Sequence, residues 1–213
     1  YYSILNGDAA ALNSWLTAAT PAQPRALWAT GSFLAYGLSN GTTAQKALLS
    51  DRFGAQPPVP AAWFGFSGGC LPLAGVGGAH FTVPGGAQVS PQALTCNGGT
   101  LDAIAVTAAA SATARAQATT LSGKALSITN DVAASGRRTI LDSFPLAMLR
   151  DSATGCVSTA AVTNRVVAAL GWFGLPNGGY CASGGVSDAG PPGTPPPATH
   201  LELTMIHEAL ILE

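Results

Sequence analysis

Between Phe53 and Leu101 the chain contains no Asp, Glu, Lys or Arg, while glycine and proline recur throughout the segment. Long helices are excluded here, because proline removes a backbone donor and glycine favours turns. We therefore predict loops and short strands in this segment, with strands at residues 80–83 and 93–96. The remainder of the chain has to supply the helices and the longer strands.

The low charge extends to the whole chain. Charged residues make up 9% of the 213 residues, against roughly 25% in average soluble proteins. Hydrophobic residues make up 47%, which allows a sizeable core, and the net charge is -1. The basic residues are scattered, so no dense basic face is visible that would neutralise nucleic-acid phosphates. No stretch reaches the roughly 18–20 apolar residues of a membrane-spanning helix. We expect neither a nucleic-acid partner nor a transmembrane segment, and the composition is typical of surface and fibre proteins.

Four cysteines, Cys70, Cys96, Cys156 and Cys181, indicate an oxidising compartment. They allow three pairings. The pairing of Cys70 with Cys96 and of Cys156 with Cys181 closes the shortest loops. Each of these loops would span about 25 residues and remove unfolded-state entropy worth roughly 3 kcal/mol. Free buried thiols are a less favoured alternative to disulfides. A zinc site is the least favoured, because no two cysteines are as close as in C-x2-C. We expect a periplasmic, cell-surface or secreted protein.

The periodicity of apolar residues predicts several elements outside the uncharged segment. In residues 43–53, Thr42 or Thr43 is the candidate N-cap and Gly54 the candidate C-cap of a helix. In residues 133–150, Pro145 must kink or end any helix. In the last predicted helix Ser158 is a candidate N-cap, and Val162, Val166, Val167 and Leu170 form one apolar stripe. We predict helices at residues 8–20, 43–53, 108–120 and 158–173, and strands at residues 101–107 and 124–129.

Residues 1–182 are predicted to form one extracytoplasmic domain. A linker rich in proline and glycine follows at residues 183–199, and residues 200–213 begin with the alternation of a terminal strand. No basic and apolar leader surrounds Tyr1, so we expect a mature or truncated ectodomain. The expected fold is α+β. An N-terminal helix and further helices pack on a mostly antiparallel sheet, with long disulfide-pinned loops.

Residues 65–69 match G-x-S-x-G, which places Ser67 at the position of a hydrolase nucleophile. The helix that should follow such a serine is not indicated, and chance matches are common in a chain with 26 glycines. An exported serine hydrolase is therefore an alternative function. The candidate partners of Ser67 in a triad are His80, His200, His207, Asp102 and Asp142.

Two further motifs are weak. His200, Glu202, His207 and Glu208 cluster near the C-terminus but lack the H-E-x-x-H spacing of a zinc site, so we expect no metal and no other cofactor. Asn40 begins an N-glycosylation sequon, for which a turn is the alternative interpretation.

Aromatic residues concentrate in and before the uncharged segment. A sugar-binding platform is one interpretation, and core packing is the favoured one, since aromatic side chains supply much of the buried area in small folds. The candidate binding aromatics are Trp28, Tyr36, Trp63, Phe64 and Phe66.

Several features together resemble the head domain of type IV pilins, most nearly the type IVb and minor, tip-adhesin kind. Residues 1–20 resemble the soluble half of the pilin helix, and Cys156–Cys181 resembles the disulfide-bounded region. Residues 101–126 are similar in style to a strand and helix of these heads. The resemblance implies a non-enzymatic structural or adhesive subunit of a bacterial extracellular filament. Its expected partners are its own copies or sibling subunits, with a host glycan or protein as a further partner. A secreted carbohydrate- or protein-binding module is the alternative.

Overall fold

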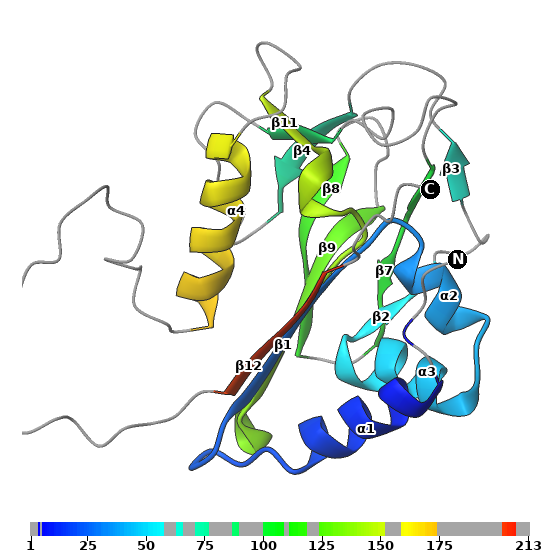
Figure 1. Ribbon diagram of the computed structural model, residues 1–213, viewed down its shortest axis with the longest axis vertical. Helices are drawn as coiled ribbons and strands as arrows, with labels where there is room; N and C mark the ends of the chain where they lie inside the picture. Colours follow the sequence, from blue (N-terminus) through cyan, green and yellow to red (C-terminus); the bar gives the residue numbers. More distant parts are fainter. Residues whose placement is uncertain are drawn as a thin grey trace, which may run out of the picture.

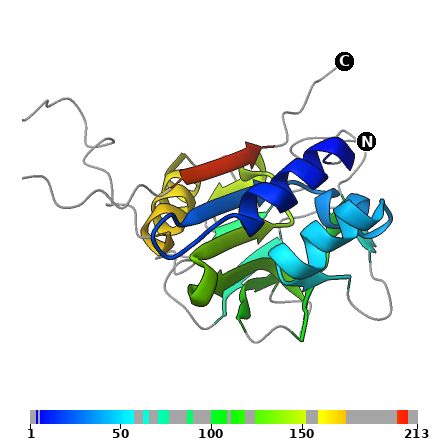
Figure 2. The same cartoon turned by 90° about the horizontal axis from the view of Figure 1, so that it is seen from below.

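The computed structural model describes residues 4, 6–57, 63–65, 71–76, 87–89, 100–108, 111–118, 124–151, 159–173 and 202–207. A twisted eight-stranded sheet separates two helical layers (Figure 1). Helix α4 covers one face, and α1, α2 and α3 cover the other, as the view from below confirms (Figure 2). Within the described residues, no helix is both long and apolar enough to cross a membrane.

The main sheet has the strand order β11-β5-β4-β8-β9-β10-β1-β12. From β11 to β10 every pairing is antiparallel, whereas β1 runs parallel to both of its neighbours, β10 and β12. The predicted combination of helices with a mostly antiparallel sheet is therefore present. The strands are β1 (Arg25–Thr30), β4 (Leu71–Gly75), β5 (Ala87–Val89), β8 (Ala112–Ala118), β9 (Ala125–Val132), β10 (Arg137–Asp142), β11 (Leu149–Asp151) and β12 (Glu202–His207).

One helical layer consists of α1 (Asn6–Thr17), α2 (Leu34–Ser39), α3 (Thr43–Ala47) and the π-helix η1 (Leu48–Arg52). Thr42 caps α3 through a capping box with Gln45, which confirms the first of the two predicted N-caps. Gly54 follows η1 with φ of +67°, a conformation that glycine adopts without steric cost. The predicted helices at residues 8–20 and 43–53 are therefore present, the second as an α-helix that continues as a π-helix.

The other layer is α4 (Thr159–Trp172), which lies within the predicted range 158–173. Its predicted apolar stripe is present only in part: Val162 and Val166 pack against the core, whereas Val167 is 37% exposed. The fully buried face consists of Ala161, Arg165 and Ala169. The buried face of α4 is therefore centred on Arg165 and not on the valines, because the Arg165 guanidinium binds the buried carboxylate of Asp142 in the sheet.

Alternation along β1 builds the two cores. Trp28 belongs to the core beneath α4, which also holds Ile140, Ala169 and Phe173. Leu27 belongs to the core beneath α1 to α3. β1 is thus buried on both faces, which is typical of a strand in a parallel arrangement.

The predicted helix at residues 108–120 is wrong, because Ala112–Ala118 form β8 between β4 and β9. Alanine favours helices, but pairing with two neighbouring strands outweighs this intrinsic preference. β10 was not predicted, although it is an interior strand of the sheet. The predicted strand at residues 124–129 is present as part of β9.

The predicted strand at residues 101–107 is divided in two. β6 (Thr100–Asp102) pairs with β3 (Trp63–Gly65), and β7 (Ala105–Val106) pairs with β2 (Ala55–Gln56). Between them Ile104 bridges to Ala125 of the main sheet. Two short 3-10 helices, η4 (Ala133–Ser135) and η5 (Leu146–Met148), complete the described elements. The predicted strands at residues 80–83 and 93–96 lie outside the described residues.

Candidate functional site

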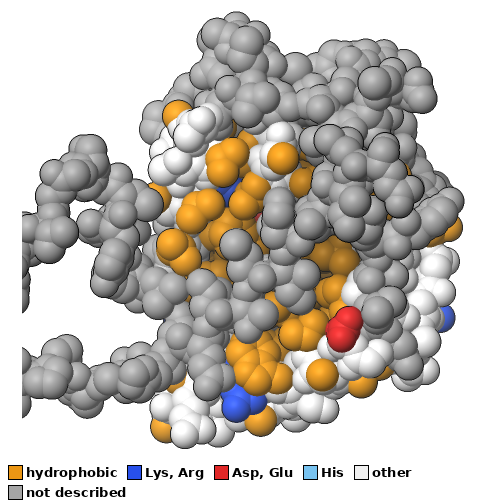
Figure 3. Space-filling model, viewed as in Figure 1, with side chains coloured by type: hydrophobic (Ala, Val, Ile, Leu, Met, Phe, Trp, Pro, Cys, Tyr) orange, Lys and Arg blue, Asp and Glu red, His pale blue; other side chains and the backbone are white. Residues whose placement is uncertain are grey.

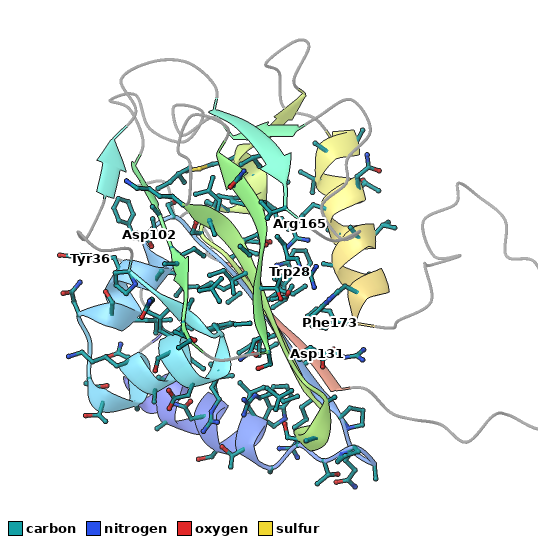
Figure 4. The ribbon with its side chains drawn as sticks, turned by 180° about the vertical axis from the view of Figure 1, so that it is seen from behind. Trp28, Tyr36, Asp102, Asp131, Arg165 and Phe173 are labelled. Atoms are coloured by element: carbon teal, nitrogen blue, oxygen red, sulfur yellow. The ribbon has the colours of Figure 1, made fainter. Side chains whose placement is uncertain are left out.

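A buried carboxylate fixes the start of α2 against β6. Oδ2 of Asp102 accepts a hydrogen bond from the backbone N–H of Tyr36 at 3.1 Å, and the N–H of Asp102 donates to the carbonyl of Ser32 at 3.2 Å. Asp102 is buried, and Figure 4 shows it close to Tyr36. Asp102 therefore satisfies one of the backbone donors that the first turn of a helix leaves open.

Two exposed aromatic residues lie at this contact, Phe33 at the N-cap of α2 and Tyr36 within α2. Tyr36 is 42% exposed and Phe33 is 38% exposed. On the other side of β6, Trp63 pairs with Asp102 and Phe64 pairs with Leu101. We call the exposed pair Phe33 and Tyr36 the aromatic corner.

Trp28, which is among the candidate binding aromatics, does not lie at the aromatic corner. Its side chain is fully buried beneath α4, and its Nε1 donates to Oδ2 of Asp142 at 2.9 Å. A surface role for Trp28 is therefore wrong, and the favoured interpretation of core packing holds for it. Phe66 lies outside the described residues.

A buried polar cluster lies between α4 and the sheet. Arg165 binds both carboxylate oxygens of Asp142, with Nε at 3.0 Å from Oδ2 and Nη2 at 2.7 Å from Oδ1. Nη2 also donates to Oγ of Ser127 at 3.3 Å, and the guanidinium carbon lies 5.4 Å from the centre of the Trp28 ring. Arg165 points from α4 towards Trp28 in Figure 4.

This cluster was not predicted as a unit. Arg165 and Asp142 are almost inaccessible to solvent, so the pair is a bidentate ion pair in the interior. Both carboxylate oxygens of Asp142, a candidate triad residue, accept hydrogen bonds from Arg165. One feature of the sequence does indicate a buried Arg165: it lies four residues after Ala161 and four before Ala169, on the same side of the helix. Both alanines are small and allow a helix to approach a sheet closely.

A second arginine lies at the C-terminal end of α4. Nη1 of Arg138 donates to the carbonyl of Phe173 at 3.2 Å, and its Nε lies 3.3 Å from a carboxylate oxygen of Asp131. A cation at the C-terminal end of a helix interacts favourably with the helix dipole. Figure 4 shows Asp131 and Phe173 at this end of the molecule.

Most of the other predicted site residues lie outside the described residues. This group includes the four cysteines, Ser67, His80, His200 and Glu208. Glu202 and His207 are the first and last residues of β12. Among the described residues, no three His, Cys, Asp or Glu side chains form a group that could hold a metal ion.

Asn40 is the C-cap of α2, with φ of -96°. Its Nδ2 donates to the carbonyl of Tyr36 at 3.1 Å. The positive φ expected of an Asn-Gly turn is therefore not adopted at Asn40, because the residue ends a helix instead.

The predicted terminal strand is present as β12 and lies at one margin of the main sheet. β12 pairs in parallel with β1, from Arg25↔Glu202 to Thr30↔His207. Among the described residues no further strand pairs with its outer side. In the view of Figure 3, hydrophobic side chains gather in the middle of the molecule, between α4 and α1. Val162 and Val166 of α4 and Leu12 and Trp15 of α1 are partly buried hydrophobic residues.

Comparison with protein-family models, with curated proteins and with solved structures gave no match to this chain.

Proposed function

We propose that this chain is a non-enzymatic structural or adhesive subunit of a bacterial extracellular filament. The observation that carries the proposal is the position of β12, which among the described strands is the outermost on one side of the sheet. An outermost strand presents backbone N–H and C=O groups that can pair with a strand of another chain. The resemblance to type IV pilin heads supports the same function.

The covalent connection of β12 supports assembly by strand exchange. A segment rich in proline and glycine precedes β12 in the sequence, and strands on such connections can pair with their own sheet or with that of a second copy. If β12 of one copy paired with β1 of the next copy, each β1 would still have two neighbouring strands. The exchanged β12 would link adjacent subunits. Because donor and acceptor are different surfaces, repeated exchange would extend in one direction and form an open filament.

A proline in β12 should abolish assembly. In Thr204→Pro the strand loses one backbone donor and the proline ring fixes its φ, so β12 pairs more weakly with β1, and pairing with β1 of a second copy is what strand exchange requires. We expect the wild-type chain to form concentration-dependent oligomers in analytical ultracentrifugation and Thr204→Pro to remain monomeric.

The matched control is Thr204→Val, which keeps the backbone donor and the β-branched shape. It should assemble like the wild type. A wild-type chain that stays monomeric at every concentration, or a proline variant that assembles equally well, would exclude β12 as the assembly strand.

Export belongs to the same proposal. The four cysteines would form disulfides, Cys70–Cys96 and Cys156–Cys181 in the pairing with the shortest loops, and these would pin the glycine- and proline-rich loops. Disulfides persist at the cell surface and in the medium, where a filament subunit has to remain folded.

The aromatic corner favours a second candidate, a carbohydrate-binding module. Exposed aromatic rings offer flat apolar faces, and tyrosine adds a hydroxyl group. For this function Tyr36→Ala should reduce retention on an immobilised polysaccharide at least about tenfold, the equivalent of roughly 1.4 kcal/mol. Tyr36→Phe, which keeps the ring, should lose much less. Equal retention of wild type and Tyr36→Ala would remove the aromatic corner from this role.

A further inference from the structure

Three of the nine basic residues gather at one end of the sheet. Arg25 begins β1 and Arg137 begins β10, and the two are directly paired in the parallel register. Arg52 ends the π-helix η1, and all three side chains are partly buried. This concentration of positive charge contrasts with the sparse charge of the rest of the chain.

The backbone of Arg52 is held firmly by the sheet. Its carbonyl accepts hydrogen bonds from Nδ2 of Asn130 at 2.9 Å and from Oγ1 of Thr139 at 2.7 Å. Its Nε donates to Oδ1 of Asn13 in α1 at 3.2 Å. The backbone of Arg52 is thus fixed by the sheet and its guanidinium by one hydrogen bond to α1, and π-helices such as η1 occur frequently at functional sites.

Arg137 has an incomplete set of interactions. Burial and the charge of Arg52 both lower the pKa of Arg137, while the charge of Asp51 raises it. Nη2 of Arg137 donates to the backbone carbonyl of Asp51 at 3.2 Å. Its Nε is buried and has no hydrogen-bond partner among the described residues. A buried donor without an acceptor is costly, and the charge of Arg52 adds repulsion.

Each neighbouring group offsets this charge only in part. The Asp51 carboxylate accepts a hydrogen bond from Oγ of Ser50 at 2.6 Å, and Asp51 is exposed. Arg25 donates to the carbonyl of Trp15 and lies over its ring, and Glu202 is its partner in the register of β12. Arg25 therefore has acceptors for part of its guanidinium, although its Nε, like that of Arg137, has no hydrogen-bond partner among the described residues. Among those residues neither Arg52 nor Arg137 forms an ion pair, and Asp51 offsets the charge of Arg137 only in part.

We propose that Arg52 and Arg137 form a binding site for a small oxyanion of the sulfate, phosphate or carboxylate class. Guanidinium groups match such anions because their N–H donors lie in one plane and bind two oxygens at once. A bound oxyanion supplies an acceptor for Nε of Arg137 and relieves the repulsion between the two arginines.

Thermal unfolding of the full chain tests the site. Sodium sulfate, phosphate or acetate is added at constant ionic strength, with sodium chloride making up the balance. At about five times Kd the anion should raise Tm by about 2–4 °C. The three salts show which oxyanion is preferred. If none of them raises Tm above the chloride control, the proposal is wrong.

Two neighbouring arginines provide matched variants. Arg137→Gln should abolish the anion-dependent rise in Tm, whereas Arg138→Gln should keep it, since Arg138 contacts Asp131 and Phe173 instead. An equal rise in Arg137→Gln and wild type would overturn the assignment. Should Arg137→Gln fail to fold, calorimetric titration of Arg52→Gln replaces it. There we expect anion affinity at least about tenfold weaker than in the wild type, and unchanged affinity would refute the site.

Discussion

Replacement of Arg165 by methionine is expected to destabilise the protein by about 3–5 kcal/mol, because it leaves Asp142 charged, buried and without its partner. The same change removes the guanidinium from the Trp28 ring and from Ser127. Urea unfolding followed by tryptophan fluorescence measures the loss, since Trp28 lies within the cluster.

A double variant distinguishes the uncompensated charge from the loss of packing. Asp142→Asn combined with Arg165→Met removes the charge and keeps an oxygen for Nε1 of Trp28. The double variant should therefore be more stable than Arg165→Met alone. If the double variant is less stable than Arg165→Met, the uncompensated charge of Asp142 is not the cause of the lost stability.

Replacement of Phe53 by alanine is expected to cost about 3–5 kcal/mol on the opposite side of the sheet. Phe53 directly follows η1 and is fully buried in the core beneath α1 to α3. The cavity left there would be lined by parts of the sheet and of the helices that cannot collapse together. The midpoint of urea unfolding should fall strongly.

Phe33→Ala is the matched control, because the same side chain is 38% exposed there. Surface substitutions usually change stability by about 0.5 kcal/mol or less, so the effect at Phe33 should be several times smaller than at Phe53. Similar losses of stability in Phe53→Ala and Phe33→Ala would mean that Phe53 does not belong to the core beneath α1 to α3.

The elements that periodicity and capping define were the predictable ones. Residues 8–20 and 158–173 repeat apolar residues at helical spacing, and Thr42 and Gly54 delimit α3 and η1. β8 was mistaken for a helix because its alanines favour a helix locally, whereas its strand conformation depends on β4 and β9, which are distant in sequence. Local preference cannot report such pairing.

The candidate sites were less predictable, since they depend on contacts across the sheet. The ion pair joins α4 to the end of β10, and neither residue indicates its partner in the sequence. The same applies to Arg52 and Arg137, which the end of η1 and the start of β10 bring together. Tyr36, one of the candidate binding aromatics, is exposed on α2, whereas Trp28 is buried in the middle of β1.

The measurement that tests the proposed function most directly is immunogold electron microscopy of the source cells with an antibody against this chain. The filament proposal predicts gold label at regular intervals along extracellular fibres, lost when the gene is deleted. Label confined to the cytoplasm, or label at the surface without any association with fibres, would contradict it.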